Sequence, residues 1–294
     1  MESFLENLLL SILRGVSISA DSLKISTADS SALNTVVKDM FNAVMLIGTG
    51  LTIAYFLIEI NRKMMFERDD FTVKSAVAPL FKLAIVLFIL ENSWNIVQAL
   101  VNAHNDIIAA SADWGKDGAG KALGEITDLG GEHPFSSLGL VAKCIACLPM
   151  IIAWLVSCVC TFVYWYKSIG YKIEFLYRIG LTPVAFADVY SGNNSNMYRW
   201  FKGFFAFALY GAAFIIIPKI TYRLVLDTYS VFWTGAGEKA LSKDALENPV
   251  GMVTLIAGSG IWTFIKFVFL QLLAPIAAIG TISSVRQLTK EAFG

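Results

Sequence analysis

The chain has 294 residues, of which 56% are hydrophobic and 16% are charged, and its mean hydropathy is +0.63. Soluble domains have about 45–50% apolar and about 25% charged residues, so this composition excludes an ordinary soluble globular protein. The 23 basic and 23 acidic residues balance, which excludes a strong net attraction to nucleic acid and makes the distribution of charge the informative feature.

The N-terminal segment, residues 1–37, lacks the basic region and the small-x-small cleavage site of a signal peptide, so we expect it to be retained. Its apolar residues recur three and four positions apart: Phe4, Leu5, Leu8, Leu9, Ile12 and Leu13. This spacing predicts an amphipathic, extracytoplasmic helix. Such a helix either lies in the membrane interface or packs on its own protein.

The rest of the chain, residues 38–294, contains about five apolar segments that reach the roughly 20 residues a helix needs to cross about 30 Å of hydrocarbon. The predicted spans are residues 40–60, 76–101, 140–165, 204–226 and 252–283. We therefore predict an all-α polytopic membrane protein.

Two connections between these spans are short and basic. They carry Arg62, Lys63, Arg68, Lys74 and Lys82 in the first, and Lys167, Lys172, Arg178, Arg199 and Lys202 in the second. Because basic loops stay in the cytoplasm, the pattern predicts that the N-terminus lies outside and the C-terminus lies in the cytoplasm.

Residues 173–191 form an apolar segment that is too short and too charged to span comfortably. Arg178, Gly180 and Pro183 interrupt it, and Pro183 disfavours a continuous straight helix. We predict a short interfacial or re-entrant helix on the cytoplasmic side. Its candidate interfacial and assembly residues are Arg178, Pro183, Asp188, Arg199 and Lys202.

A family resemblance lies in the same region. The run Arg178-Ile-Gly-Leu-Thr-Pro-Val-Ala-Phe-Ala-Asp-Val-Tyr-Ser, followed by Arg199-Trp-Phe-Lys-Gly-Phe-Phe and a long apolar span, resembles the TrbL-type polytopic subunit of type IV secretion and conjugation systems. In that family an arginine and a Gly/Ala-x-x-Pro apolar element precede a polar break and a helix opened by basic residues. The chain lacks the long C-terminal extension of some relatives, which puts contacts made by such a tail in doubt.

The resemblance implies a function. It implies an oligomeric, non-enzymatic subunit of the bacterial cytoplasmic (inner) membrane that helps DNA–protein or protein substrates to pass in conjugation. The implied partners are further copies of the chain, membrane lipids, other secretion-system subunits including an ATPase, and the translocated substrate. We expect no cofactor, although a structural phospholipid fits such a protein. The alternative is a stand-alone membrane channel or small-molecule transporter.

Lys266 lies about midway along the last predicted span, where a lone cation costs roughly 2.5–3.5 kcal/mol. It therefore needs a partner acid, a water-filled cavity or a lipid headgroup. We predict that Lys266 faces an intersubunit groove or central cavity; an ordinary buried ion pair is the alternative.

Motifs for catalysis and metal binding are weak. Residues 115–122 approach a phosphate-binding loop, but Ala122 replaces its serine or threonine and no apolar strand precedes it. His104 and His133 lie in the predicted outer loop without a metal-ligand spacing. Cys144, Cys147, Cys158 and Cys160 all lie in one apolar segment, where we expect buried packing residues. We therefore predict that the chain is not an enzyme.

Overall fold

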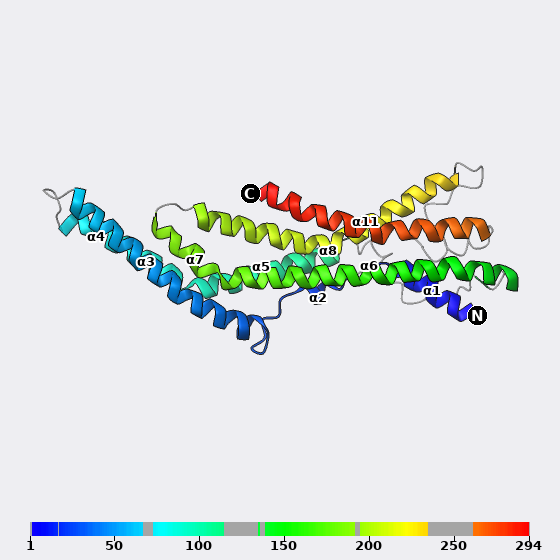
Figure 1. The fold of residues 1–294 in the computed structure, drawn as a ribbon, viewed down its shortest axis with the longest axis horizontal. Coiled ribbons are helices and arrows are strands. Elements are labelled where there is room, and N and C mark those ends of the chain that lie inside the picture. Colours follow the sequence, from blue (N-terminus) through cyan, green and yellow to red (C-terminus); the bar gives the residue numbers. More distant parts are fainter. Residues whose placement is uncertain are drawn as a thin grey trace. The chain divides into compact units, whose positions relative to one another are not determined.

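The computed structural model describes residues 2–16, 18–66, 73–114, 135, 139–191, 195–234 and 261–293. Every regular element in these ranges is a helix (Figure 1), which confirms the predicted all-α class. The chain divides into two compact units. Unit 1 comprises Met1–Leu23, Ile108–Ile169 and Tyr210–Gln287, and unit 2 comprises Lys24–Ile107, Gly170–Leu209 and Leu288–Gly294.

The helices follow in chain order. The first are α1 (Glu2–Arg14), α2 (Ala20–Leu23), a π-helical turn (Leu33–Val37), α3 (Lys38–Phe66), α4 (Val73–Glu91) and α5 (Ser93–Asp113). The others are α6 (Leu140–Gly180), α7 (Thr182–Ala187), a 3-10 turn (Asp188–Ser191), α8 (Ser195–Thr234) and α11 (Ile261–Phe293).

Four of the described helical segments are long and apolar enough to cross a membrane: Leu33–Phe66, Leu140–Gly180, Asn196–Tyr222 and Phe264–Thr289. A fifth crossing results if α4 and α5 count as one span bent by 48°. The number of crossings, their orientation and the boundary between residues 37 and 38 stay predictions.

The predicted span 76–101 runs across the bend between α4 and α5. The side chain of Asn92 donates to the Phe88 carbonyl at 2.9 Å, and the Ser93 hydroxyl donates to the Leu90 carbonyl at 2.5 Å. Side chains that bond nearby carbonyls in this way compete with helix hydrogen bonds, which gives a local reason for the break.

The predicted short helix 173–191 is divided in the structure. Its first half continues α6, which runs without interruption for 41 residues (Figure 1). At about 1.5 Å per residue α6 is about 60 Å long, roughly twice the hydrocarbon core of a membrane. Pro183 lies in the first turn of α7, where its missing N–H costs nothing. The separate short helix in the structure is therefore α7, and no helix begins at residue 173.

The core of unit 1 includes the N-terminal helix. Leu5, Leu8, Leu9 and Ile12 of α1 belong to one buried cluster with Met150 and its neighbours on α6 and with Phe264 and its neighbours on α11. Glu2 also forms an ion pair with Lys143 of α6. Of the two arrangements that the sequence left open, α1 adopts the one in which it packs on its own protein.

In unit 2, α3 packs on α4 and α7 through a narrow stripe. Phe41, Gly48 and Thr52 are its buried residues, and they recur at helical spacing. The other faces of α3 carry exposed apolar side chains, among them Leu46 and Ile47. Only 11% of the most apolar stretch of α3 is buried, so most of this helix needs a cover other than its own chain.

Candidate functional site

Arg178, the first predicted assembly residue, lies inside unit 2 between α6 and α8. Its guanidinium is 3.5 Å from the Glu174 carboxylate and lies 4.1 Å from the centre of the Phe207 ring. Gly203 leaves room for it, because a Cβ there would lie 2.8 Å from Arg178 Nη1. Arg178 therefore joins two helices of its own chain.

Pro183 and Asp188 also make internal contacts in unit 2. Pro183 is buried, and its carbonyl lies so close to α3 that a Cβ on Gly48 would be 2.9 Å from it. The Asp188 carboxylate accepts a hydrogen bond from the Asn196 amide, which links the 3-10 turn to the start of α8. These two predicted assembly residues hold the turn region in place.

Arg199 and Lys202 differ from the other predicted assembly residues. Arg199 is exposed on α8, and the half-buried Lys202 lies with its ammonium 4.8 Å from the centre of the Tyr198 ring. These two cations therefore lie at the surface of unit 2, where another molecule can meet them.

Lys266 is exposed on α11 in unit 1. Within the part of the chain that the structure describes, it forms no salt bridge. The alternative of an ion pair buried among those residues is therefore not realised. Whether Lys266 faces a cavity, a neighbouring copy or a lipid headgroup stays a prediction.

Two other lysines near predicted spans donate hydrogen bonds to backbone carbonyls of other helices in unit 1. Lys219 of α8 donates to the carbonyls of Ala112 and Trp114 at 2.9 and 2.7 Å. These carbonyls lie at the C-terminal end of α5, where a cation is favourable. Lys167 of α6 donates to the Ile279 carbonyl of α11 at 3.3 Å.

His104 is not in a loop, as the sequence predicted, but is buried on α5 in unit 2. Its Nε2 lies 2.5 Å from the Tyr171 hydroxyl, and its ring packs on Phe175 with centroids 4.4 Å apart. His133 lies outside the described residues. Among the described residues no three metal-binding side chains gather, so His104 is a hydrogen-bonded core residue.

The cysteines differ from the predicted buried set. All four are free; Cys160 is buried, but Cys144 and Cys158 are exposed on α6, so the prediction is wrong for these two. The glycine-rich stretch at residues 115–122 lies outside the described residues.

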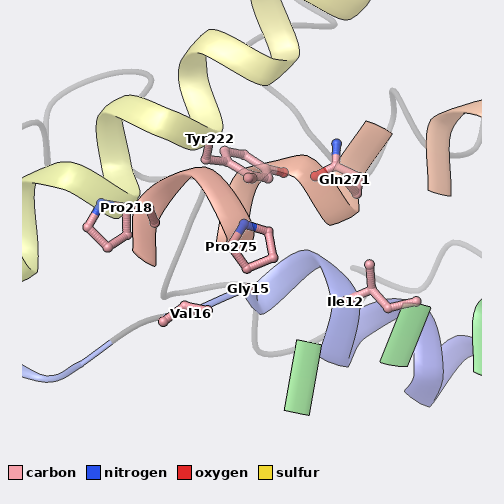
Figure 2. A pocket seen from close by; sticks show the side chains of 9 residues that line it. Ile12, Gly15, Val16, Pro218, Tyr222, Gln271 and Pro275 are labelled. Carbon is pink, nitrogen blue, oxygen red and sulfur yellow. The ribbon is translucent and has the colours of Figure 1, made fainter. Parts of the chain in front are cut away.

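A small cavity, lined mostly by apolar residues together with Tyr222 and Gln271, lies in unit 1 between α8, α11 and the end of α1. Figure 2 shows the Tyr222 hydroxyl pointing toward the side chain of Gln271, with Pro218 and Pro275 close by. The Tyr222 hydroxyl and the Gln271 amide nitrogen are buried and have no hydrogen-bond partner among the described residues. The cavity holds about 10 Å³, which is close to the minimum for one water molecule. It is too small to admit a transported molecule.

A side chain of α6 replaces the helix hydrogen bond that Pro218 removes from α8. Pro218 lacks the N–H that would bond the Phe214 carbonyl four residues earlier in α8. The Tyr164 hydroxyl of α6 donates to that carbonyl at 2.7 Å. The Pro218 position therefore fixes α6 against α8 within unit 1.

An open groove of about 730 Å³ lies in unit 2, between α3, α4 and the 3-10 turn. It is lined by Tyr55, Ile58, Glu59, Arg62, Lys63, Phe66, Lys82, Tyr190 and Ser191, which we call the basic groove. The three cations outnumber the single carboxylate, so the groove favours an anion.

Lys82 of α4 lines the basic groove. Its ammonium lies 3.6 Å from a Glu59 oxygen and 4.6 Å from the centre of the Tyr190 ring. The Tyr190 hydroxyl donates to the Pro79 carbonyl at 3.4 Å. Burial and the nearby Glu59 carboxylate raise the pKa of Tyr190, so its hydroxyl stays neutral. Sequence patterns missed this groove because it joins segments that are far apart in the chain.

Comparison of the chain with protein-family models, with curated proteins and with solved structures finds no match. The resemblance to the TrbL-type family therefore rests on residues 178–191 and 199–205 alone.

Proposed function

We propose that the chain is a non-enzymatic subunit of a conjugative type IV secretion machine in the bacterial cytoplasmic membrane. In this role it forms a homo-oligomer that acts as a scaffold or conduit for DNA–protein or protein substrates. The observation that carries the proposal is the amount of apolar surface that one copy leaves uncovered. On α3, Leu46 is 77% exposed and Ile47 is 58% exposed.

Similar exposure recurs on the other long apolar helices. Phe81 and Phe88 of α4 are exposed, as are Leu148 and Phe162 of α6. Contiguous apolar surface of this extent marks a membrane or protein interface. Lipid covers part of such a surface, and further copies of the chain cover part of it when the subunit assembles.

The residues that carry the family resemblance support two roles. Arg178, Pro183 and Asp188 stabilise the turn between α6 and α8. Arg199 and Lys202 remain at the surface of α8, where they are available to another subunit, an ATPase partner or the phosphates of a DNA substrate. The same short segment thus combines a rigid turn with a basic surface.

The alternative, a stand-alone channel or small-molecule transporter, needs a polar path inside one copy. The cavity at Tyr222 and Gln271 is close to the size of one water molecule, and Lys266 is exposed on α11 instead of lining that cavity. A conduit between copies fits these observations better than a pore within one copy.

The mass of the detergent-extracted particle tests the proposal. We expect a ring-sized homo-oligomer that cross-links through cysteines introduced on the exposed faces of α4 and α6, at positions such as Phe88 and Phe162. A monodisperse monomer, or a gene neighbourhood without a secretion ATPase, a coupling protein and a relaxase, would contradict the proposal.

Lys266 offers a sharper variant within the same test. Lys266→Leu is expected to lower assembly or conjugative transfer, because it removes the charge proposed to face the intersubunit cavity. Lys266→Arg keeps a cation at this position and is expected to retain assembly and conjugative transfer. Normal assembly and transfer by Lys266→Leu would refute this role.

A further inference from the structure

We propose that the basic groove of unit 2 binds the phosphate of an anionic phospholipid headgroup. The proposal rests on three features of the groove: its size, its charge and its mixture of aromatic and cationic side chains. The lipid site requires that the chain lies in a membrane, but it does not require the proposed secretion function. A monomer that binds the lipid would therefore refute the secretion function and leave the lipid site standing.

The size of the groove matches a lipid headgroup. Its volume of about 730 Å³ lies within the roughly 300–1,000 Å³ of small-molecule sites. Ile58 and Phe66 line it beside the polar residues. Phe66 is 83% exposed and Ile58 is 63% exposed, which provides apolar surface for the glycerol and the upper acyl chains.

The charges of the groove select an anion. Arg62 is exposed at its edge, and its planar guanidinium suits a bidentate contact with phosphate. Lys82 also lines the groove, with its ammonium near both the Glu59 carboxylate and the Tyr190 ring. Among the described lining residues, Glu59 carries the one carboxylate beside the cations Arg62 and Lys82, and a phosphate anion suits this pair of cations.

The surroundings favour a lipid over a soluble phosphate. Tyr55 and Tyr190 line the groove, and tyrosines are enriched where membrane meets water. In the predicted orientation the groove faces the cytoplasmic leaflet, which carries the anionic lipids. A free phosphate would make no use of the exposed Ile58 and Phe66 beside the cations.

The test measures binding of a fluorescent phosphatidylglycerol to the detergent-solubilised full chain, with a phosphatidylcholine analogue as the neutral comparison. We expect tighter binding of phosphatidylglycerol. Arg62→Gln is expected to weaken it about fivefold, because one cation near an anionic surface contributes on the order of 1 kcal/mol. Arg286→Gln removes another exposed arginine outside the groove and is expected to leave binding unchanged.

A gain-of-binding variant separates recognition from structural damage. Glu59→Gln removes the carboxylate that competes for Lys82 and is expected to tighten phosphatidylglycerol binding by up to about fivefold. A variant that merely disturbs the fold would not bind more tightly. Equal affinity of all four proteins, or no preference for phosphatidylglycerol, would overturn the site. Displacement of the lipid by millimolar inorganic phosphate would overturn its assignment to a lipid.

Discussion

The helices α3 and α8 have nearly the same apolar character but opposite surroundings. In their most apolar stretches, 11% of residues are buried in α3 and 67% in α8. In α8 the buried residues include Phe214, which touches the rings of Tyr164 and Tyr210. In α3 the buried stripe is narrow and includes a close contact of Gly48 with Pro183. Hydropathy therefore identifies apolar helices without telling which ones face their own chain.

The largest effect is expected from a cavity in the buried stretch of α8. Phe214 is 0% exposed, and Phe214→Ala removes a ring that packs 5.3 Å from Tyr164 and 5.2 Å from Tyr210. We expect a loss of about 3–5 kcal/mol in the free energy of unfolding, measured by detergent-based denaturation. Leu224→Ala, on the exposed side of the same helix, serves as the control and is expected to cost far less.

The next largest effect is expected at the packed stripe of α3. Gly48→Ala places a methyl group 2.9 Å from the Pro183 backbone carbonyl, which has little freedom to move. We expect a loss of about 1–3 kcal/mol in the stability of unit 2, measured by the same denaturation. Gly50→Ala is the matched control, because a Cβ there meets nothing within 4 Å. Equal stability of the two variants would show that α3 does not pack on α7 in this way.

A smaller loss of stability is expected when the hydrogen bond to the Phe214 carbonyl, which Pro218 leaves without its helix partner, is removed. Tyr164→Phe removes the hydroxyl that donates to the Phe214 carbonyl at 2.7 Å, so that carbonyl loses this hydrogen bond. We expect a loss of about 0.5–2 kcal/mol, since hydrogen bonds between membrane helices are modest. Tyr166→Phe, at a position that is 72% exposed, is the control. A larger loss in the control would contradict this account of Pro218.

The smallest effect on stability is expected at the exposed face of α3. Leu46 is 77% exposed, so Leu46→Ala removes almost no packing within one copy. We expect a change below about 0.5 kcal/mol in the free energy of unfolding of the solubilised chain. A loss as large as that of Phe214→Ala would mean that α3 is covered by its own chain.

Much of the fold follows from patterns that are local in sequence. Runs of about 20 apolar residues predicted the helices, and the spacing of three and four residues between Leu5, Leu8 and Ile12 predicted α1. Two features that the patterns did not predict have local physical causes. Asn92 and Ser93 bond nearby carbonyls and break the second segment, while Pro183 fits the first turn of α7 and lets α6 continue to Gly180.

The candidate sites were less accessible to sequence reasoning because they depend on contacts between distant segments. Arg178 was singled out, but its neighbour Phe207 lies on another helix. Glu59, Lys82 and Tyr190 come from three elements, and no spacing rule joins them. His104 was placed in a loop because the apolar pattern weakens after residue 101, whereas its hydrogen bond to Tyr171 keeps it in the core of unit 2.

The central claim, that the exposed apolar face of α3 lies in lipid, is tested most directly by a spin label at Leu46→Cys. The four native cysteines are replaced by alanine, and the labelled chain is reconstituted in phospholipid vesicles. We predict frequent collisions of the label with oxygen, which partitions into hydrocarbon, and rare collisions with a water-soluble nickel chelate. Frequent collisions with the nickel chelate would place this face of α3 in water and contradict the account.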